Sequence, residues 1–122
     1  MYQYFIYSAF GWLAFSGTMH FIVDVVSQYL RGKHVPGTEA TLYYGLHSAF
    51  SLGQVAFGIL GLYLAKRNIH LLMETPIILL CLFSGIGWLA VTFYFMEYWE
   101  PKLAVSLFIL LILATWIVRV RI

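Results

Sequence analysis

Two histidines and an aspartate are the residues of this chain whose types and spacing could do chemistry. His20 and Asp24 lie one helical turn apart inside the long apolar run that opens the sequence, and His47 lies inside the second apolar run. Titratable groups at membrane depth are costly, so they usually face a bundle interior and often mark a site. Asp24 is a natural partner for His20, because a carboxylate one turn away fixes the tautomer of an imidazole.

Further polar residues extend this set into a candidate pocket. Ser51 and Gln54 follow His47 at helical spacing and form a polar stripe on the second run, while Thr92 and Glu97 lie in or just after the third. We expect Thr92 near the level of the histidines and Glu97 near Asp24 or slightly outside it. The stripes together predict a broken polar path, suited to ligand binding or proton relay, from the outer surface to about mid-membrane.

The depths of the two histidines agree. With a rise of about 1.5 Å per residue, His20 lies about 15 Å inside the end of the first helix at Leu30. By the same measure His47 lies about 12 Å inside the start of the second helix near Glu39. We therefore predict that His20 and His47 form one site in the outer half of the bundle, with Asp24 orienting His20 and Thr92 or Glu97 closing the third side.

Each of these residues also has a structural explanation. Ser, Thr, Gln and His often link helices in lipid, where such contacts contribute about 0.6 kcal/mol on average. Glycines on the same faces, such as Gly58 and Gly61, would allow close helix approach. Asp24 shifts the balance toward function, because a carboxylate inside a span must be neutral, paired or hydrated.

The composition places these residues in a membrane protein. Hydrophobic residues make up 62% of the 122 and charged residues 10%, against about 25% charged in soluble domains. Four stretches, 1–23, 40–65, 75–96 and 103–118, contain no Asp, Glu, Lys or Arg. Because a spanning helix needs about 20 mostly apolar residues, we predict an all-α, four-transmembrane-helix up-down bundle. Its helices are expected at about 3–30, 39–65, 75–98 and 101–120, in a single domain covering 1–122.

The helix ends are marked by turn and capping residues. Thr75 before Pro76 and Glu100 before Pro101 predict the starts of the third and fourth helices. The connections are short, so sequential helices should be antiparallel neighbours. We expect the first run to be retained, because it is longer than the apolar region of a signal peptide and has no basic start. A single cysteine, Cys81, excludes an intramolecular disulfide.

The charges favour one orientation and exclude one kind of partner. Lys and Arg prefer the cytoplasmic side, and four of them would share the side of both termini, against three on the other. We therefore favour N-in and C-in. A net charge of +2, with the cations at helix ends, gives no support for nucleic acid binding. The expected partners are the lipid bilayer and either further copies of the chain or a larger membrane complex.

Short motifs in the first two runs resemble a known group of proteins. The segments Gly17-Thr18-Met19-His20-Phe21 and Tyr44-Gly45-Leu46-His47-Ser48-Ala49-Phe50-Ser51-Leu52-Gly53, with the later Phe57-Gly58-Ile59-Leu60, are similar to patterns in small bacterial four-helix membrane proteins of broadly DoxX-like architecture. The resemblance covers most of the chain. It implies a four-helix fold and a setting in the bacterial inner membrane, and it carries no chemistry.

Four classes of function fit these observations. We favour a binding or accessory membrane subunit whose polar pocket holds a small molecule, a lipid headgroup or a partner helix. Proton-linked transport or relay is the first alternative. A haem b or divalent metal site with His20 and His47 as ligands is the second, since one His from each of two facing helices suits such ligation. An enzyme using His20 and Asp24 as an acid-base pair comes last, because no nucleophile motif accompanies them.

Overall fold

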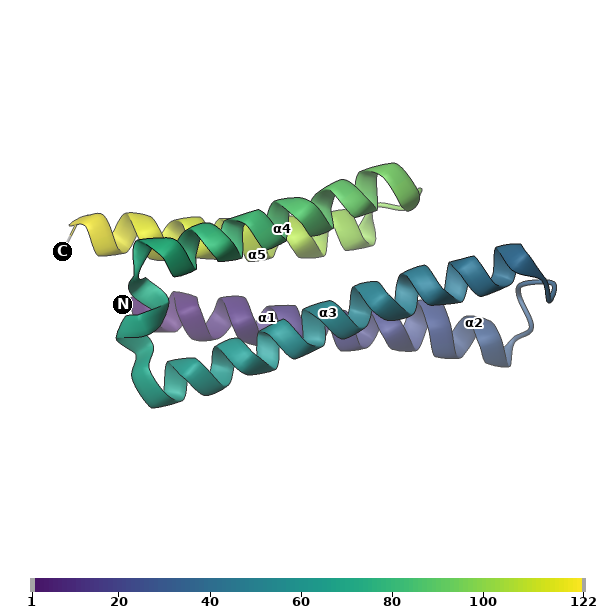
Figure 1. The fold of residues 1–122 in the computed structure, drawn as a ribbon, viewed down its shortest axis with the longest axis horizontal. Helices are drawn as coiled ribbons and strands as arrows, with labels where there is room; N and C mark the ends of the chain where they lie inside the picture. Colours follow the sequence, from purple (N-terminus) through teal and green to yellow (C-terminus); the bar gives the residue numbers. More distant parts are fainter. Residues whose placement is uncertain (1, 122) are drawn as a thin grey trace.

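The computed structural model describes residues 2–121, which form helices joined by short connections and contain no strand (Figure 1). The first rod comprises α1 (Tyr2–Phe21), the π-helical segment η1 (Ile22–Val26) and α2 (Ser27–Leu30). It is followed by α3 (Thr38–Asn68), the 3-10 helix η2 (Ile69–Met73), α4 (Thr75–Phe95) and α5 (Glu100–Arg121). The predicted all-α bundle is confirmed.

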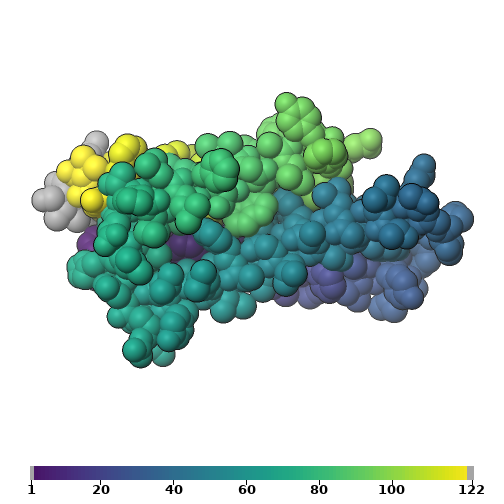
Figure 2. All heavy atoms as spheres, viewed as in Figure 1, coloured from purple at the N-terminus to yellow at the C-terminus, as the bar shows by residue number. Residues whose placement is uncertain are grey.

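Within residues 2–121, four helical segments are long and apolar enough to cross a membrane: Tyr2–Leu30, Thr38–Met73, Thr75–Phe95 and Glu100–Val120. Many of their large apolar side chains point outward, among them Phe83, Tyr94 and Leu110. In a bilayer these side chains would meet lipid, which is as apolar as a protein core. The space-filling view shows α3 and α4 covering most of one face, with little of α1 visible between them (Figure 2). This surface is that of a multi-pass membrane protein.

Helices that follow one another in the chain are not all in close contact. α1 packs against both α3 and α5, and α4 packs against α5. α3 and α4 follow one another in the chain but have few close backbone approaches, and the ring centroid of Trp88 on α4 lies 5.5 Å from that of Phe57 on α3. The start of α1 and the end of α5 lie at the same end of the bundle (Figure 1). The expectation that sequential helices are neighbours therefore holds less well for α3 and α4 than for the other sequential pairs.

Glycines set the close contact of α1 with α3. A Cβ on Gly58 would lie 2.7 Å from the backbone nitrogen of Ala14, and one on Gly17 would lie 2.9 Å from Cβ of Gln54. No larger side chain fits at either position without moving the helices apart. The same contact brings the polar residues of the two helices together.

Two helix ends and one capping residue differ from the sequence-based prediction, whereas the predicted start of α4 at Thr75 is confirmed. α4 ends at Phe95 instead of residue 98, because Met96 takes an extended conformation. α3 continues to Asn68 and leads directly into η2, beyond the predicted end at residue 65. The N-cap of α4 is Glu74 instead of Thr75, and the Thr75 hydroxyl accepts a hydrogen bond from Arg119.

Candidate functional site

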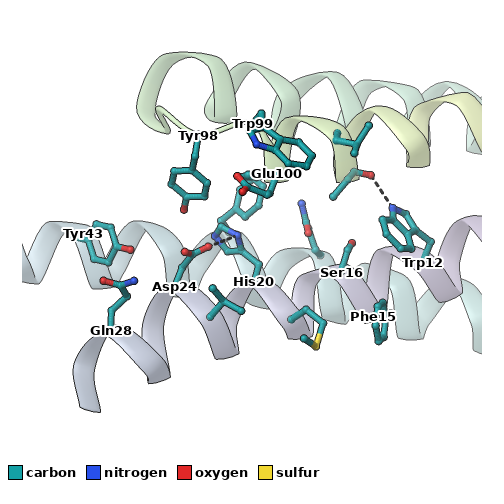
Figure 3. Close-up of a pocket in the computed structure, with 17 residues that line it drawn as sticks. Trp12, Phe15, Ser16, His20, Asp24, Gln28, Tyr43, Tyr98, Trp99 and Glu100 are labelled. Atoms are coloured by element: carbon teal, nitrogen blue, oxygen red, sulfur yellow. Dashed lines mark hydrogen bonds and ion pairs between the residues drawn. The ribbon is translucent and has the colours of Figure 1, made fainter. Parts of the chain in front are cut away.

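Polar residues of α1, η1 and α3 form a hydrogen-bonded chain at the centre of the site, and Figure 3 shows its first pair, Asp24 and His20. Oδ2 of Asp24 accepts a hydrogen bond from Nδ1 of His20 at 2.8 Å. Nε2 of His20 lies 2.9 Å from Nδ1 of His47 across the interface between α1 and α3. The two histidines therefore face each other at one level, as the depth argument expects.

The hydrogen-bonded chain of Asp24, His20 and His47 is mostly buried. His47 is 2% exposed, and the side chains of His20 and Asp24 are 8% and 13% exposed. Buried polar groups need partners, and each member of the chain provides one for the next. Because Asp24 accepts from Nδ1 of His20, the neutral His20 ring keeps a lone pair on Nε2, and His47 donates to it through Nδ1.

The π-helical segment η1 carries Asp24 and changes the direction of the residues after it. Its wider turn, with the Ser27 N–H bonded to the Ile22 carbonyl, replaces the regular pattern of α1. Gln28 consequently lines the pocket, whereas Ser27, which a regular helix places on the His20 face, does not. The sequence pattern alone gave no sign of this segment.

The third side of the site is built by the connection between α4 and α5. The Tyr98 hydroxyl lies 3.4 Å from Nδ1 of His47. Lys102 fixes this connection, since its Nζ donates to the carbonyls of Met96 at 2.7 Å and Tyr98 at 2.9 Å. Burial, together with the nearby carboxylate of Asp24, raises the pKa of Tyr98, so its hydroxyl stays protonated and can donate to an acceptor other than Nδ1 of His47, whose proton is used in the bond to His20.

The other predicted site residues have different positions. Thr92 is fully buried, but its hydroxyl donates to the Leu89 carbonyl of its own helix at 2.6 Å and is not part of the pocket wall. Glu97 is exposed and also lies outside the pocket wall. The structure therefore places Tyr98, in place of Thr92 or Glu97, on the third side.

Ser51 and Gln54 are both buried on α3 and have unpaired atoms. Neither Oγ of Ser51 nor Nε2 of Gln54 has a hydrogen-bond partner within residues 2–121. Gln54 lines the pocket, whereas Ser51 does not. Among the described residues the hydrogen-bonded chain thus does not continue through Ser51, so the inner part of the predicted polar path is interrupted there.

A pocket of about 560 Å³ opens beside the hydrogen-bonded residues, between α1, α3 and the start of α5 (Figure 3). Its buried wall carries His20, Asp24 and Gln54, and Tyr98 closes one end. Its remaining wall is mostly apolar and aromatic, with Trp12, Phe15, Met19, Val23, Phe50, Trp99, Pro101, Leu103 and Ala104, and it also includes Ser16, Gln28, Tyr43 and Glu100. The arrangement offers hydrogen bonds at one wall and apolar contact elsewhere.

Several pocket residues were missed by reasoning from the sequence. From the sequence, Tyr43, Tyr98 and Trp99 have no expected role in the site, and Glu100 marks only a helix start. Tyr43 could have been found, because it precedes His47 by one helical turn and its ring centroid lies 4.2 Å from that of His47. Tyr98, Trp99 and Glu100 depend on where α4 ends, for which the sequence gave no clear signal.

A haem held between the two histidines does not fit this geometry. Axial ligands lie on opposite sides of the iron, and metal–imidazole distances of about 2.0–2.1 Å would separate the two nitrogens by about 4 Å. Nε2 of His20 and Nδ1 of His47 are 2.9 Å apart and in direct contact. Ligation of the iron by both rings would require α1 and α3 to move apart, against the tight contact at Gly58.

Comparisons with protein-family models, curated proteins and solved structures found no match to this chain. The resemblance to DoxX-like proteins therefore stays a prediction from the sequence motifs.

Proposed function

We propose that this protein is a membrane-embedded binding protein for a small amphiphile that has a hydrogen-bond-accepting oxygen at its polar end and an apolar body. The single observation that carries the proposal is the unpaired amide of Gln54, which lines a largely apolar pocket beside the chain of Asp24, His20 and His47. The proposed setting is the bacterial inner membrane, with both termini in the cytoplasm.

The size and lining of the pocket support this class of ligand. Small-molecule sites typically enclose about 300–1,000 Å³, with mostly apolar walls and a few placed polar groups. This pocket has a volume of about 560 Å³ and matches that description. Trp12 and Trp99 would contribute large apolar contact areas to the ligand body.

The donors of the polar wall favour an acceptor oxygen on the ligand. Nε2 of Gln54 is a donor without a partner within residues 2–121, and the Tyr98 hydroxyl can donate as well. A buried unpaired amide is unfavourable, commonly by about 1–3 kcal/mol. A hydroxyl or carbonyl oxygen of a ligand would remove this cost, whereas a purely apolar ligand would leave it.

The rim of the pocket favours entry from the bilayer. Phe15 and Leu103 are more than half exposed on the outer surfaces of α1 and α5, where acyl chains would lie around the bundle. An amphiphile dissolved in the membrane could therefore enter between these helices without crossing water. Its polar end would then lie at the wall formed by Gln54 and His20.

Fluorescence quenching of the purified protein in phosphatidylcholine nanodiscs tests the proposal. A long-chain alcohol with bromine atoms on its chain should quench Trp12 and Trp99 saturably, because bromine quenches indole at contact. A brominated alkane of the same length, without the hydroxyl, should quench only in proportion to its concentration in the lipid. Equal, unsaturable quenching by both compounds would refute the proposal.

Variants locate the binding in the pocket. Gln54→Leu keeps the side-chain size but removes the amide, and loss of one hydrogen bond of about 1.4 kcal/mol corresponds to about tenfold weaker binding. Thr115→Val is the matched control, because Thr115 is a buried polar residue whose hydroxyl bonds to the Leu111 carbonyl, away from the pocket. The control should bind as the wild type does, and equal weakening in both variants would contradict the role of Gln54.

A further inference from the structure

The ligand atoms of His20, Asp24 and His47 are close enough to surround one metal ion. Each residue offers one such atom, and the three atoms all lie within 4.8 Å of one another. Two come from α1 and η1, and the third comes from α3. The proposed amphiphile pocket does not require a metal, so this juxtaposition is a separate observation.

The distance between the two imidazoles suits a cation bound by both on the same side. Two nitrogens at about 2.0–2.1 Å from a tetrahedral zinc ion lie about 3.3 Å apart. Nε2 of His20 and Nδ1 of His47 are 2.9 Å apart, so the nitrogens need to separate by only a few tenths of an ångström while the two rings turn their lone pairs toward the ion. The contact that excludes axial haem ligation is therefore close to the spacing of adjacent ligands.

Asp24 prepares His20 for this role. Its carboxylate accepts the Nδ1 proton of His20 at 2.8 Å, which leaves the Nε2 lone pair directed at His47. A carboxylate that holds a ligating imidazole in this way is the usual outer partner in zinc sites. When a cation binds, His47 need only move its proton from Nδ1 to Nε2, and both rings then present lone pairs to the ion.

The remaining coordination positions would face the pocket. The Tyr98 hydroxyl lies 3.4 Å from the ligating nitrogen of His47, and the pocket beside it can hold water. Two imidazoles with oxygen ligands suit zinc and similar transition metals, whereas magnesium and calcium prefer all-oxygen sites. A site with positions left to water is of the open type.

We propose that His20 and His47 bind a divalent transition-metal ion of the zinc type through Nε2 and Nδ1, with Asp24 as the residue that positions His20. This inference goes beyond the proposed binding function. It is tested without any amphiphile, and the fluorescence test is carried out with chelator present, so that either proposal can fail alone.

Calorimetric titration of zinc into metal-depleted protein in detergent is the first test. The wild type should bind zinc in a single high-affinity step. His20→Ala and His47→Ala should each bind at least about 100-fold more weakly. His70→Ala is the matched control, because His70 is an exposed histidine on η2, and it should bind as the wild type does. Absence of binding by the wild type, or equal loss in the control, would overturn the proposal.

The role of Asp24 is tested by Asp24→Asn, which retains an acceptor oxygen for His20. Loss of an outer-shell partner typically weakens metal binding by about 10–100-fold without removing it. Cobalt in place of zinc gives a visible spectrum that reports the ligand set, and this spectrum should be unchanged in shape in Asp24→Asn. A changed spectrum would show that Asp24 is itself a ligand and would overturn its assignment as a positioning residue.

A measurement on the wild type avoids variants that fail to fold. The chain has four histidines, and the imidazole nitrogen resonances of His34 and His70 can be assigned with His34→Gln and His70→Gln. Zinc should shift the resonances of His20 and His47 and leave the other two in place. Shifts confined to His34 and His70 would place the metal elsewhere and refute the proposal.

Discussion

The contact between His20 and His47 should appear as an energetic coupling between the two residues. We expect His20→Ala and His47→Ala to destabilise the protein by about 1–3 kcal/mol each, because each leaves a buried partner unsatisfied. Once one imidazole is absent, the other has lost its 2.9 Å partner already. The double variant should therefore be less destabilised than the sum of the single variants.

The size of the coupling follows from the geometry of the contact. Side-chain hydrogen bonds between membrane helices average about 0.6 kcal/mol and reach about 1.7 kcal/mol. This pair is short and almost fully buried, and His20 is also held by Asp24. We therefore expect a coupling between about 0.5 and 1.7 kcal/mol. The tilted ring contact between His47 and Tyr43 is lost in both variants that lack His47, so it cancels in the cycle.

The free energies of unfolding can be measured by denaturation of the purified variants in mixed detergent micelles, without added metal. A second cycle on His20→Ala and His70→Ala serves as the control, because His70 is exposed and lies on η2. Distant sites should be additive within about 0.3–0.5 kcal/mol. Additivity of the His20 and His47 variants to the same extent would show two independent histidines and refute the shared site.

Three further predictions follow from the structure. Asp24→Asn should lower the free energy of unfolding by about 1–3 kcal/mol, because it weakens a buried charge-assisted hydrogen bond. Glu97→Gln, at an exposed position, should stay within about 0.5 kcal/mol of the wild type. Equal effects of the two variants in denaturation experiments would show that Asp24 is not part of the buried hydrogen-bonded chain. Gly58→Ala should destabilise the protein by about 1–3 kcal/mol, since its Cβ would lie 2.7 Å from a backbone nitrogen of α1. The control is Gly45→Ala on the same helix, whose Cβ meets nothing within 4 Å and which should not be destabilising. Similar melting temperatures of the two variants would contradict the close α1–α3 contact. Single cysteines can be introduced at Gln3, Lys33 and Val120 in a background with Cys81→Ala. The cysteines at Gln3 and Val120 should react with a membrane-impermeant thiol reagent from one side of a vesicle, and the cysteine at Lys33 should react from the other side. Labelling of Gln3 and Val120 from opposite sides would refute the four-span topology.

The membrane character of the chain and its helices could be predicted from the sequence. Long runs without charged residues leave few alternatives, because only a helix satisfies every backbone group of such a run within lipid. The pairing of His20 with Asp24 was also predictable, since residues one turn apart on a helix are neighbours whatever the surroundings. The facing of His20 and His47 followed from comparable depth on adjacent helices.

The residue that forms the third side of the site, Tyr98, could not be predicted from the sequence. It depends on the exact end of α4 at Phe95 and on the two carbonyl contacts made by Lys102, which turn Tyr98 toward His47. A helix end in an apolar sequence without Pro or Gly has no strong local signal. Thr92 could not be excluded from the pocket beforehand either, because the rotation of a helix about its axis is set by its neighbours.

The sequence by itself determined which runs are long and apolar enough to cross a membrane and which faces of α1 and α3 are polar, because both properties depend only on composition and helical periodicity. The tertiary structure decided how these faces are used. The wide turn of η1 places Gln28 on the pocket, and the glycine contacts of α3 set the 2.9 Å approach of the histidines. The glycine contacts join residues far apart in the chain, and the wide turn departs from regular helical spacing, so a pattern read along one regular helix contains neither feature.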